Sequence, residues 1–421
     1  MTKDTEISYK STTIACYMGN FVQATVINLT PILFIPLKEQ FGLSFQQLGM
    51  LVLINFLTQV VCDILFSTIV DKYGFRPFVV FAHILTVVGF LLFALSPVIF
   101  EKPYIGFVIA TIIFSGAGGL LELLLSPIIN SIPTDEKATA MSILHSFYAW
   151  GQVAVVLITT LFLFVFGRNM WQWIVVIWTL PPLINFFLFM KVPIAHSVSD
   201  EHRQGLRMLI LKPFFIVAFL AILFGGASEV SINQWTSAFM EEVMKIPKVV
   251  GDTAGMCMFA VMLGMGRLLY GIYGKRINVG KVMMLGAFFA IICYLVIALS
   301  TISILSLLAC AACGFAVSLL WPGTLVLASE RFPFAGAWLF AILAAGGDIG
   351  ASAGPWLVSV VTEQAPKFSF ISSIAVSLGF NNEQVGLRLG ILIAALFPIG
   401  AFICLICMNR SNKNISNGIV L

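Results

Sequence analysis

The sequence is dominated by long apolar runs, each about as long as a membrane is thick. A helix that crosses the hydrocarbon core of a bilayer needs about 20 consecutive apolar residues. Glycine, proline and charged residues divide this chain into twelve such runs. The runs are residues 12–36, 46–70, 77–98, 105–129, 140–166, 170–191, 213–240, 250–273, 281–301, 303–328, 335–361 and 386–408. Because lipid cannot pair with backbone N–H and C=O groups, the pattern predicts an all-α membrane protein with twelve transmembrane helices.

The composition excludes a soluble enzyme. Apolar residues make up 60% of the chain and charged residues only 10%, too few to cover the surface of a soluble globule of this size. The net charge of +4 is spread over short loops, so no patch for nucleic acid is expected. The sequence contains neither H-E-x-x-H nor G-x-x-x-x-G-K-[ST]. We therefore expect neither an enzyme nor a cofactor.

The eight cysteines all lie within apolar runs, where a thiol packs as a small hydrophobic group. Two pairs, 310/313 and 404/407, have the C-x-x-C spacing of a zinc site, but no His or Asp lies beside them. We expect no metal site and no disulfide framework. The first residues show no cleavable signal pattern, so the first apolar run is expected to remain as a membrane helix.

The loop charges predict the orientation of the chain. With both termini on one side, that side collects most of the Lys and Arg residues of the loops. Positively charged loops stay cytoplasmic, so both termini are expected in the cytoplasm. This predicts a multi-pass protein of the plasma (cytoplasmic) membrane, the cell inner membrane, with the lipid bilayer as its surroundings and a monomeric state.

The chain is predicted to consist of two six-helix halves. Residues 192–212 form the longest polar segment and fall at the midpoint of the twelve runs. They are interpreted as a cytoplasmic linker between an N-terminal half, 1–191, and a C-terminal half, 213–421. The outer loop 362–385 contains an apolar stretch too short to span, and we expect it to be interfacial or re-entrant.

A weak internal repeat supports this division. The turn STIVDKYGFR (67–76) after the second run corresponds to GIYGKRINVG (271–280) after the eighth. Aligning the two turns also aligns Asp63 with Arg267. Each half therefore carries one charge at a similar predicted depth in the bilayer, as expected for two related halves.

The first of these turns resembles the loop signature G-x-x-x-D-[RK]-x-G-[RK]-[RK] of the major facilitator superfamily. Asp71, Lys72, Gly74 and Arg76 match it. The resemblance covers the whole chain when twelve helices and a central linker are included. It implies two pseudo-symmetric halves that work by alternating access, with this turn and Arg267 as parts of a conformational switch.

A narrower resemblance is to the fucose permease-like branch of sugar:proton symporters. It is carried by GAGGLLELLLSP (116–127), in which Glu122 lies among small residues ahead of a proline. Further matching stretches are ILHSFYAWG (143–151), GGASEVSINQW (225–235) and GDIGASAGP (347–355). The resemblance implies proton-coupled sugar transport with Glu122 in the place of that branch's helix 4 acid.

Five charged residues fall inside the predicted membrane helices, away from the ends of the runs: Asp63, Glu122, Glu229, Arg267 and Asp348. A charge at the centre of a membrane helix costs about 2.5 to 3.5 kcal/mol or more, so such residues are usually paired or functional. We predict Glu122, Asp63 and Asp348 as cation-coupling residues, because a carboxyl group can load and release a proton. The alternative is that these groups only bind helices to one another.

Amide and aromatic side chains share helix faces with these charges. In the fifth run, His145, Tyr148 and Gln152 lie on one face at helical spacing. Amides both donate and accept, and an aromatic ring packs on the C–H face of a sugar, so the set suits a polyhydroxylated ligand. The predicted substrate-binding residues are Gln23, Asn28, His145, Glu229, Asn233, Trp235 and Trp321.

These features predict a secondary active transporter that imports a neutral sugar or polyol together with protons. Two alternatives remain open. Sodium is the alternative coupling ion, because Asp63 is similar in place to cation sites of other sugar symporters of the superfamily. The alternative function is proton-coupled export of small amphipathic compounds, which the many Phe and Met residues would also allow.

Overall fold

The computed structural model of the chain is helical wherever it describes regular structure. It describes residues 8–133, 137–194, 212–273, 276–332, 337–377 and 379–416. Ten helices in this part are long and apolar enough to cross a membrane, and the bent pair α1 and α2 counts as an eleventh. At the eleventh predicted run lies α16 (Ala337–Gln364), with 28 residues. The predicted class, an all-α membrane protein, is confirmed.

The helices follow the predicted runs closely. The N-terminal half contains α1 (Lys10–Ile32), α2 (Phe34–Phe41), α3 (Phe45–Tyr73), α4 (Phe75–Ile99), α5 (Pro103–Ser131), α6 (Lys137–Phe166), η1 (Arg168–Met170), α7 (Trp171–Ile177) and α8 (Leu180–Lys191). The C-terminal half begins with α10 (Pro213–Glu242), α11 (Lys248–Val250), the π-helix η2 (Gly251–Cys257), α12 (Met258–Tyr273) and α13 (Val279–Leu299). It continues with α14 (Ser303–Val317), α15 (Leu320–Arg331), α16, η4 (Ala365–Lys367), α17 (Ser369–Ser377), α18 (Asn382–Ala394) and α19 (Leu396–Ser416).

Four predicted runs are interrupted by short breaks. Each break comes three or four residues before a proline: Leu33 before Pro36, Trp178 and Thr179 before Pro182, Ser318 before Pro322, and Ala395 before Pro398. The proline ring clashes with the carbonyl group four residues earlier and offers no N–H to it, so the helix breaks at that point. The bend between α1 and α2 measures 45°.

The two halves meet along a seam that several helices form. In this seam α3 packs against α16, α6 packs against α12 and η2, and α1 packs against α10. The contact between α3 and α16 is very close, because a Cβ atom on Gly49 would lie 2.1 Å from Oγ of Ser359. Only glycine at this position allows the two helices to lie so near to each other.

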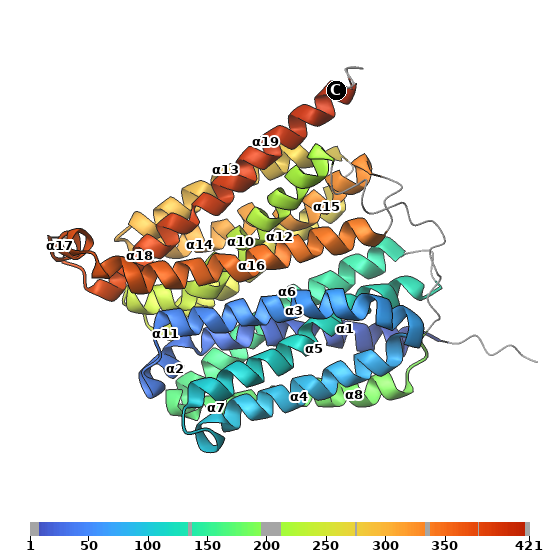
Figure 1. Ribbon diagram of the computed structural model, residues 1–421, viewed down its shortest axis with the longest axis horizontal. Helices are drawn as coiled ribbons and strands as arrows, with labels where there is room; N and C mark the ends of the chain where they lie inside the picture. Colours follow the sequence, from blue (N-terminus) through green and yellow to red (C-terminus); the bar gives the residue numbers. More distant parts are fainter. Residues whose placement is uncertain are drawn as a thin grey trace, which may run out of the picture.

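The two ends of the bundle differ. Helix α1 begins and helix α19 finishes at the same end, which we call the terminal end; the opposite end, where α2, α11 and α18 lie, is the far end (Figure 1). The halves lie close together at the far end and spread apart toward the terminal end (Figure 1). The central part of the predicted linker, residues 195–211, lies outside the described residues.

Within the predicted interfacial loop, α17 projects from the far end, away from the other helices (Figure 1). Phe368 and Phe370 are 64% and 75% exposed. Exposed aromatic side chains at this level fit an interfacial position. The interfacial assignment itself stays a prediction.

Candidate functional site

Gln23 and Glu122 join α1 and α5 inside the N-terminal half. Nε2 of Gln23 donates a hydrogen bond to Oε2 of Glu122 over 2.9 Å. Gln23 is buried and Glu122 is partly buried. A hydrogen bond donated to a carboxylate stabilises its charged form. The structure therefore brings together a predicted substrate-binding amide and a predicted coupling carboxyl.

A chain of amides crosses the seam between the halves. Nε2 of Gln152 on α6 donates to Oδ1 of Asn233 on α10 over 2.6 Å. Nδ2 of Asn233 in turn donates to Oδ1 of Asn28 on α1 over 3.1 Å. Nδ2 of Asn28 lies 3.4 Å from the hydroxyl group of Tyr148 on α6. We call Gln152, Asn233, Asn28 and Tyr148 the amide seam.

The amide seam contains two predicted substrate-binding residues, Asn28 and Asn233. Its other two members, Gln152 and Tyr148, had no predicted role. In this conformation Asn233 donates to Asn28 and accepts from Gln152. Gln152 and Tyr148 share a helix face with His145, and this spacing was the signal in the sequence for their participation. Their partners on α1 and α10 depend on the packing of the two halves.

Glu229 and Arg267 form an ion pair between α10 and α12. NH2 of Arg267 lies 3.0 Å from both carboxylate oxygens of Glu229. Nε of Arg267 donates to the backbone carbonyl group of Ser318 over 3.3 Å. The two side chains are 12% and 28% exposed, respectively. The cationic side chain among the five predicted membrane charges is thus already neutralised.

Asp63 and Asp348 lie on the two helices of the closest seam contact, α3 and α16. Oδ1 of Asp63 and Oδ2 of Asp348 are buried and have no hydrogen-bond partner. Asp348 is 3% exposed. No ion pair between described residues involves either of them. Glu122 and Glu229, by contrast, have partners: Gln23 donates to Glu122, and Arg267 forms an ion pair with Glu229.

The two predicted tryptophans have different surroundings. Trp321 on α15 is partly buried, and its ring edge fits against glycines: a Cβ atom on Gly347 would lie 2.5 Å from its Cη2. Trp235 on α10 is fully buried, and its Nε1 donates to the carbonyl group of Pro355 over 3.0 Å. His145 is exposed on α6. A substrate contact of each remains a prediction.

The turn between α3 and α4 carries the superfamily signature. Gly74 has a φ of 80°, a left-handed conformation that favours glycine. Arg76 donates to the carbonyl groups of Phe189 and Val192 over 2.8 and 2.6 Å, so it ties the start of α4 to the end of α8. Lys72 is exposed, and the side chain of Asp71 lies outside the described part. The switching role of this turn stays a prediction.

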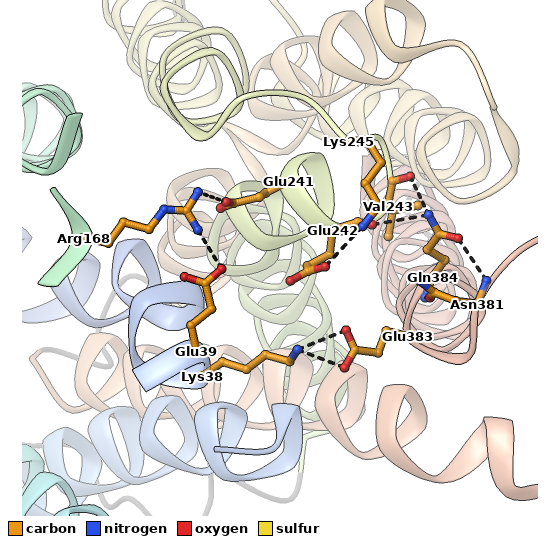
Figure 2. Close-up of polar contacts among 10 residues, drawn as sticks. All are labelled: Lys38, Glu39, Arg168, Glu241, Glu242, Val243, Lys245, Asn381, Glu383 and Gln384. Atoms are coloured by element: carbon orange, nitrogen blue, oxygen red, sulfur yellow. Dashed lines mark hydrogen bonds and ion pairs between the residues drawn. The ribbon is translucent and has the colours of Figure 1, made fainter. Parts of the chain in front are cut away.

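Ion pairs across the halves close the far end (Figure 2). Arg168 of η1 reaches Glu39 of α2 over 2.9 Å and Glu241 of α10, which belongs to the other half. Lys38 of α2 lies 2.9 Å from Glu383 of α18, again across the seam. The sequence placed these charges in outer loops, and only the fold could reveal which of them meet.

A second charged group lies buried at the far end. Nζ of Lys248 on α11 lies 3.1 Å from Oδ2 of Asp252 in η2 and 2.9 Å from Oγ of Ser237. Oγ1 of Thr160 on α6 donates to the same Asp252 oxygen over 2.6 Å. Asp252 is fully buried and lies near the start of the candidate span Lys248–Tyr273, so it is a further charge in a spanning helix, which sequence reasoning missed. Its four-residue spacing from Lys248 was a usable signal.

Comparison with known proteins agrees with this architecture. The family model described as Major Facilitator Superfamily matches residues 13–355. A D-xylose-proton symporter aligns with a TM-score of 0.75 and 15% identity, covering 93% of this chain and 97% of its own. The fucose:proton symporter of E. coli aligns with a TM-score of 0.63 and 15% identity, covering 95% and 99%.

A bacterial homolog to the human lysosomal transporter Spinster, in an inward-facing and occupied conformation, aligns with a TM-score of 0.73 and 17% identity. The alignment covers 96% of this chain and 97% of that one. No curated protein sequence matches. At such identities the solved structures show a shared fold, whereas the family model matches most of the sequence. The chain therefore belongs to the major facilitator superfamily, as a transporter and not as an enzyme.

Proposed function

We propose that this transporter imports a neutral sugar or polyol together with protons, by alternating access in the plasma membrane. The Glu229–Arg267 ion pair is the observation that favours a neutral substrate. A dedicated anion site needs a free cationic donor, and Arg267 is already bound to both oxygens of Glu229. A sugar phosphate or dicarboxylate would have to break this pair before it could bind.

The amide seam supports a polyhydroxylated substrate. Its amides and its phenol present donors and acceptors side by side, which is what hydroxyl groups require. Buried polar groups of this kind reject ligands that leave them unpaired. Trp321 supplies a partly exposed ring for the C–H face of a sugar.

The coupling ion is proposed to be the proton, with Glu122, Asp63 and Asp348 as the candidate carriers. Glu122 is the first of these, because Gln23 links it to the substrate-binding face of α1. Sodium is the alternative that the experiment below distinguishes. We further propose that both termini are cytoplasmic, that the transporter is a monomer, and that residues 1–191 rock against residues 213–421.

Ligand-induced stabilisation of the purified protein tests the substrate class. The panel contains neutral sugars, polyols, sugar acids, sugar phosphates and lipophilic cations, at two pH values and with or without sodium. We expect stabilisation by at least one neutral sugar or polyol, amounting to about 2.7 kcal/mol at a hundredfold excess over its Kd. Stabilisation by sugar acids, sugar phosphates or lipophilic cations alone would overturn the proposed substrate.

Transport in proteoliposomes then tests the coupling. An inward pH gradient should drive accumulation of the stabilising sugar, and a protonophore should abolish it. Glu122→Gln should lose accumulation but keep exchange of labelled for unlabelled sugar at equal pH, because binding and coupling are separate roles. Accumulation that follows a sodium gradient and ignores the pH gradient would replace the proton by sodium.

A further inference from the structure

The three predicted coupling carboxyls come from three neighbouring helices that belong to both halves. Asp63 lies on α3 and Glu122 on α5, and a Cβ atom on Gly119 would lie 2.9 Å from the backbone of Gln59. The α3 and α5 backbones are therefore in contact one turn before the two acids. Asp348 lies on α16 of the C-terminal half, and α16 packs against α3 along the seam.

Several buried oxygens at this junction have no hydrogen-bond partner. Besides Asp63 and Asp348, they include Oε1 of Gln59 and Oγ of Ser115, and both of these side chains are 0% exposed. Oε1 of Gln59 would lie 3.1 Å from a Cβ atom on Gly118, so it points at α5 one turn before the acids. Buried polar atoms without a hydrogen-bond partner are costly.

The described residues of the surrounding helices do not supply a free cation. On α10 and α12, Glu229 and Arg267 neutralise each other. On α1 the facing polar group is the neutral Gln23, and on α3 the neighbour of Asp63 is the thiol of Cys62. No described Lys or Arg forms an ion pair with the three carboxyls.

Three negative charges without a cation would be unstable at this depth. Hydrogen bonding distinguishes the three groups. Glu122 accepts a hydrogen bond from Gln23, which stabilises a carboxylate, whereas Asp63 and Asp348 each leave a buried oxygen without any donor. A proton on each aspartate removes the unpaired charge, and with it most of the cost of burying the group.

We propose that Asp63 and Asp348 form a proton-binding site shared by the two halves, and that both remain protonated in this conformation while Glu122 is ionised. The inference rests on the proposed function, which it refines: Glu122 exchanges the transported proton, and the aspartates hold retained protons. Neutral aspartates let α3 pack against α16, and their deprotonation at alkaline pH would drive these helices apart.

Infrared difference spectroscopy tests the protonation states directly. The purified wild-type protein near neutral pH should show C=O stretching bands of protonated carboxylic acids. Asp63→Asn and Asp348→Asn should each remove one such band, and Glu122→Gln should leave both bands in place. Persistence of the bands in both Asn variants, or their loss only in Glu122→Gln, would overturn the assignment.

Equilibrium exchange of labelled sugar gives a second readout without a gradient. We expect exchange by the wild type to fall as the pH rises, as the aspartates lose their protons. The double variant Asp63→Asn, Asp348→Asn mimics the protonated pair and should flatten this profile. An unchanged profile in a variant that melts like the wild type would contradict the proposal.

Added sodium tests whether a sodium ion, and not protons, neutralises the two aspartates. If sodium chloride added at constant pH removes the wild-type bands, while potassium chloride does not, a sodium ion neutralises the site and the proton assignment falls. The proposed function is judged separately by gradient-driven uptake. Proton-driven accumulation with unchanged bands in the Asn variants would reject this inference alone.

Discussion

The Glu229–Arg267 pair shows how one contact decides the chemistry that a membrane site can offer. Both residues lie within spans, and each would be costly alone at this depth. Because Arg267 is bound to Glu229, it is not a free cation, and the proposed recognition relies on amides. Whether the pair also stabilises the fold depends on the loss of hydration that it suffers on burial.

Removing one partner of this pair should harm the protein more than removing both. Arg267→Met leaves Glu229 without its donor and should cost about 1 to 3 kcal/mol, with a lower apparent Tm in detergent. The double variant Glu229→Gln, Arg267→Met should melt above either single variant. Melting of the double variant below both single variants would contradict the ion pair.

At the scale of elements, glycine sets how closely the helices of the two halves approach. Gly49 brings α3 against α16 at the far end, and this contact exists only in a conformation in which the far end is closed. A side chain there would act on the balance of conformations and not on either half alone. A shift in the balance of conformations can therefore be distinguished from a loss of stability of either half.

Gly49→Ala should shift the protein toward a conformation open at the far end. Overpacking of this kind costs about 1 to 3 kcal/mol. Spin labels at Lys102 and Thr301, which are exposed at the far end of opposite halves, should report longer distances. Gly116→Ala is the control, since its Cβ atom would lie no nearer than 3.6 Å to a neighbouring atom. Equal distances in both variants would refute the role of Gly49.

The sequence predicted the helices well because length and apolarity alone determine a membrane span. It also contained the signal for the breaks, since Pro322 and Pro36 each follow one by three or four residues. It could not predict that Gln23 would meet Glu122, 99 residues away, because such a contact depends on tertiary packing. The pairing of Arg267 with Glu229 was missed for the same reason.

At the scale of the whole molecule, charge holds the far end closed. Arg168 bridges Glu39 of its own half and Glu241 of the other, and Lys38 reaches Glu383 (Figure 2). Most of these side chains are partly exposed, so each pair alone contributes little. As a network across the seam, they bias the halves toward the conformation seen here.

Arg168→Gln should raise the population of the far-end-open conformation. The longer distances between labels at Lys102 and Thr301 would show it, and high salt should shift the wild type in the same direction, since salt screens exposed charges. Lys245→Gln is the matched control, because Lys245 pairs with Glu242 inside one half. A shift of equal size in the control would mean that the network does not link the halves.

Trp235 gives the molecule a built-in optical signal. Its ring belongs to α10, yet it packs against Phe34 and Phe45 of the other half, with ring centroids 5.1 and 5.7 Å apart. Opening of the far end must pull this indole away from both rings and into water, so its emission should move to longer wavelength and weaken. Each turnover would then be visible without any attached dye, and Trp235→Phe should abolish that part of the fluorescence change while a substitution of the exposed Trp173 should not.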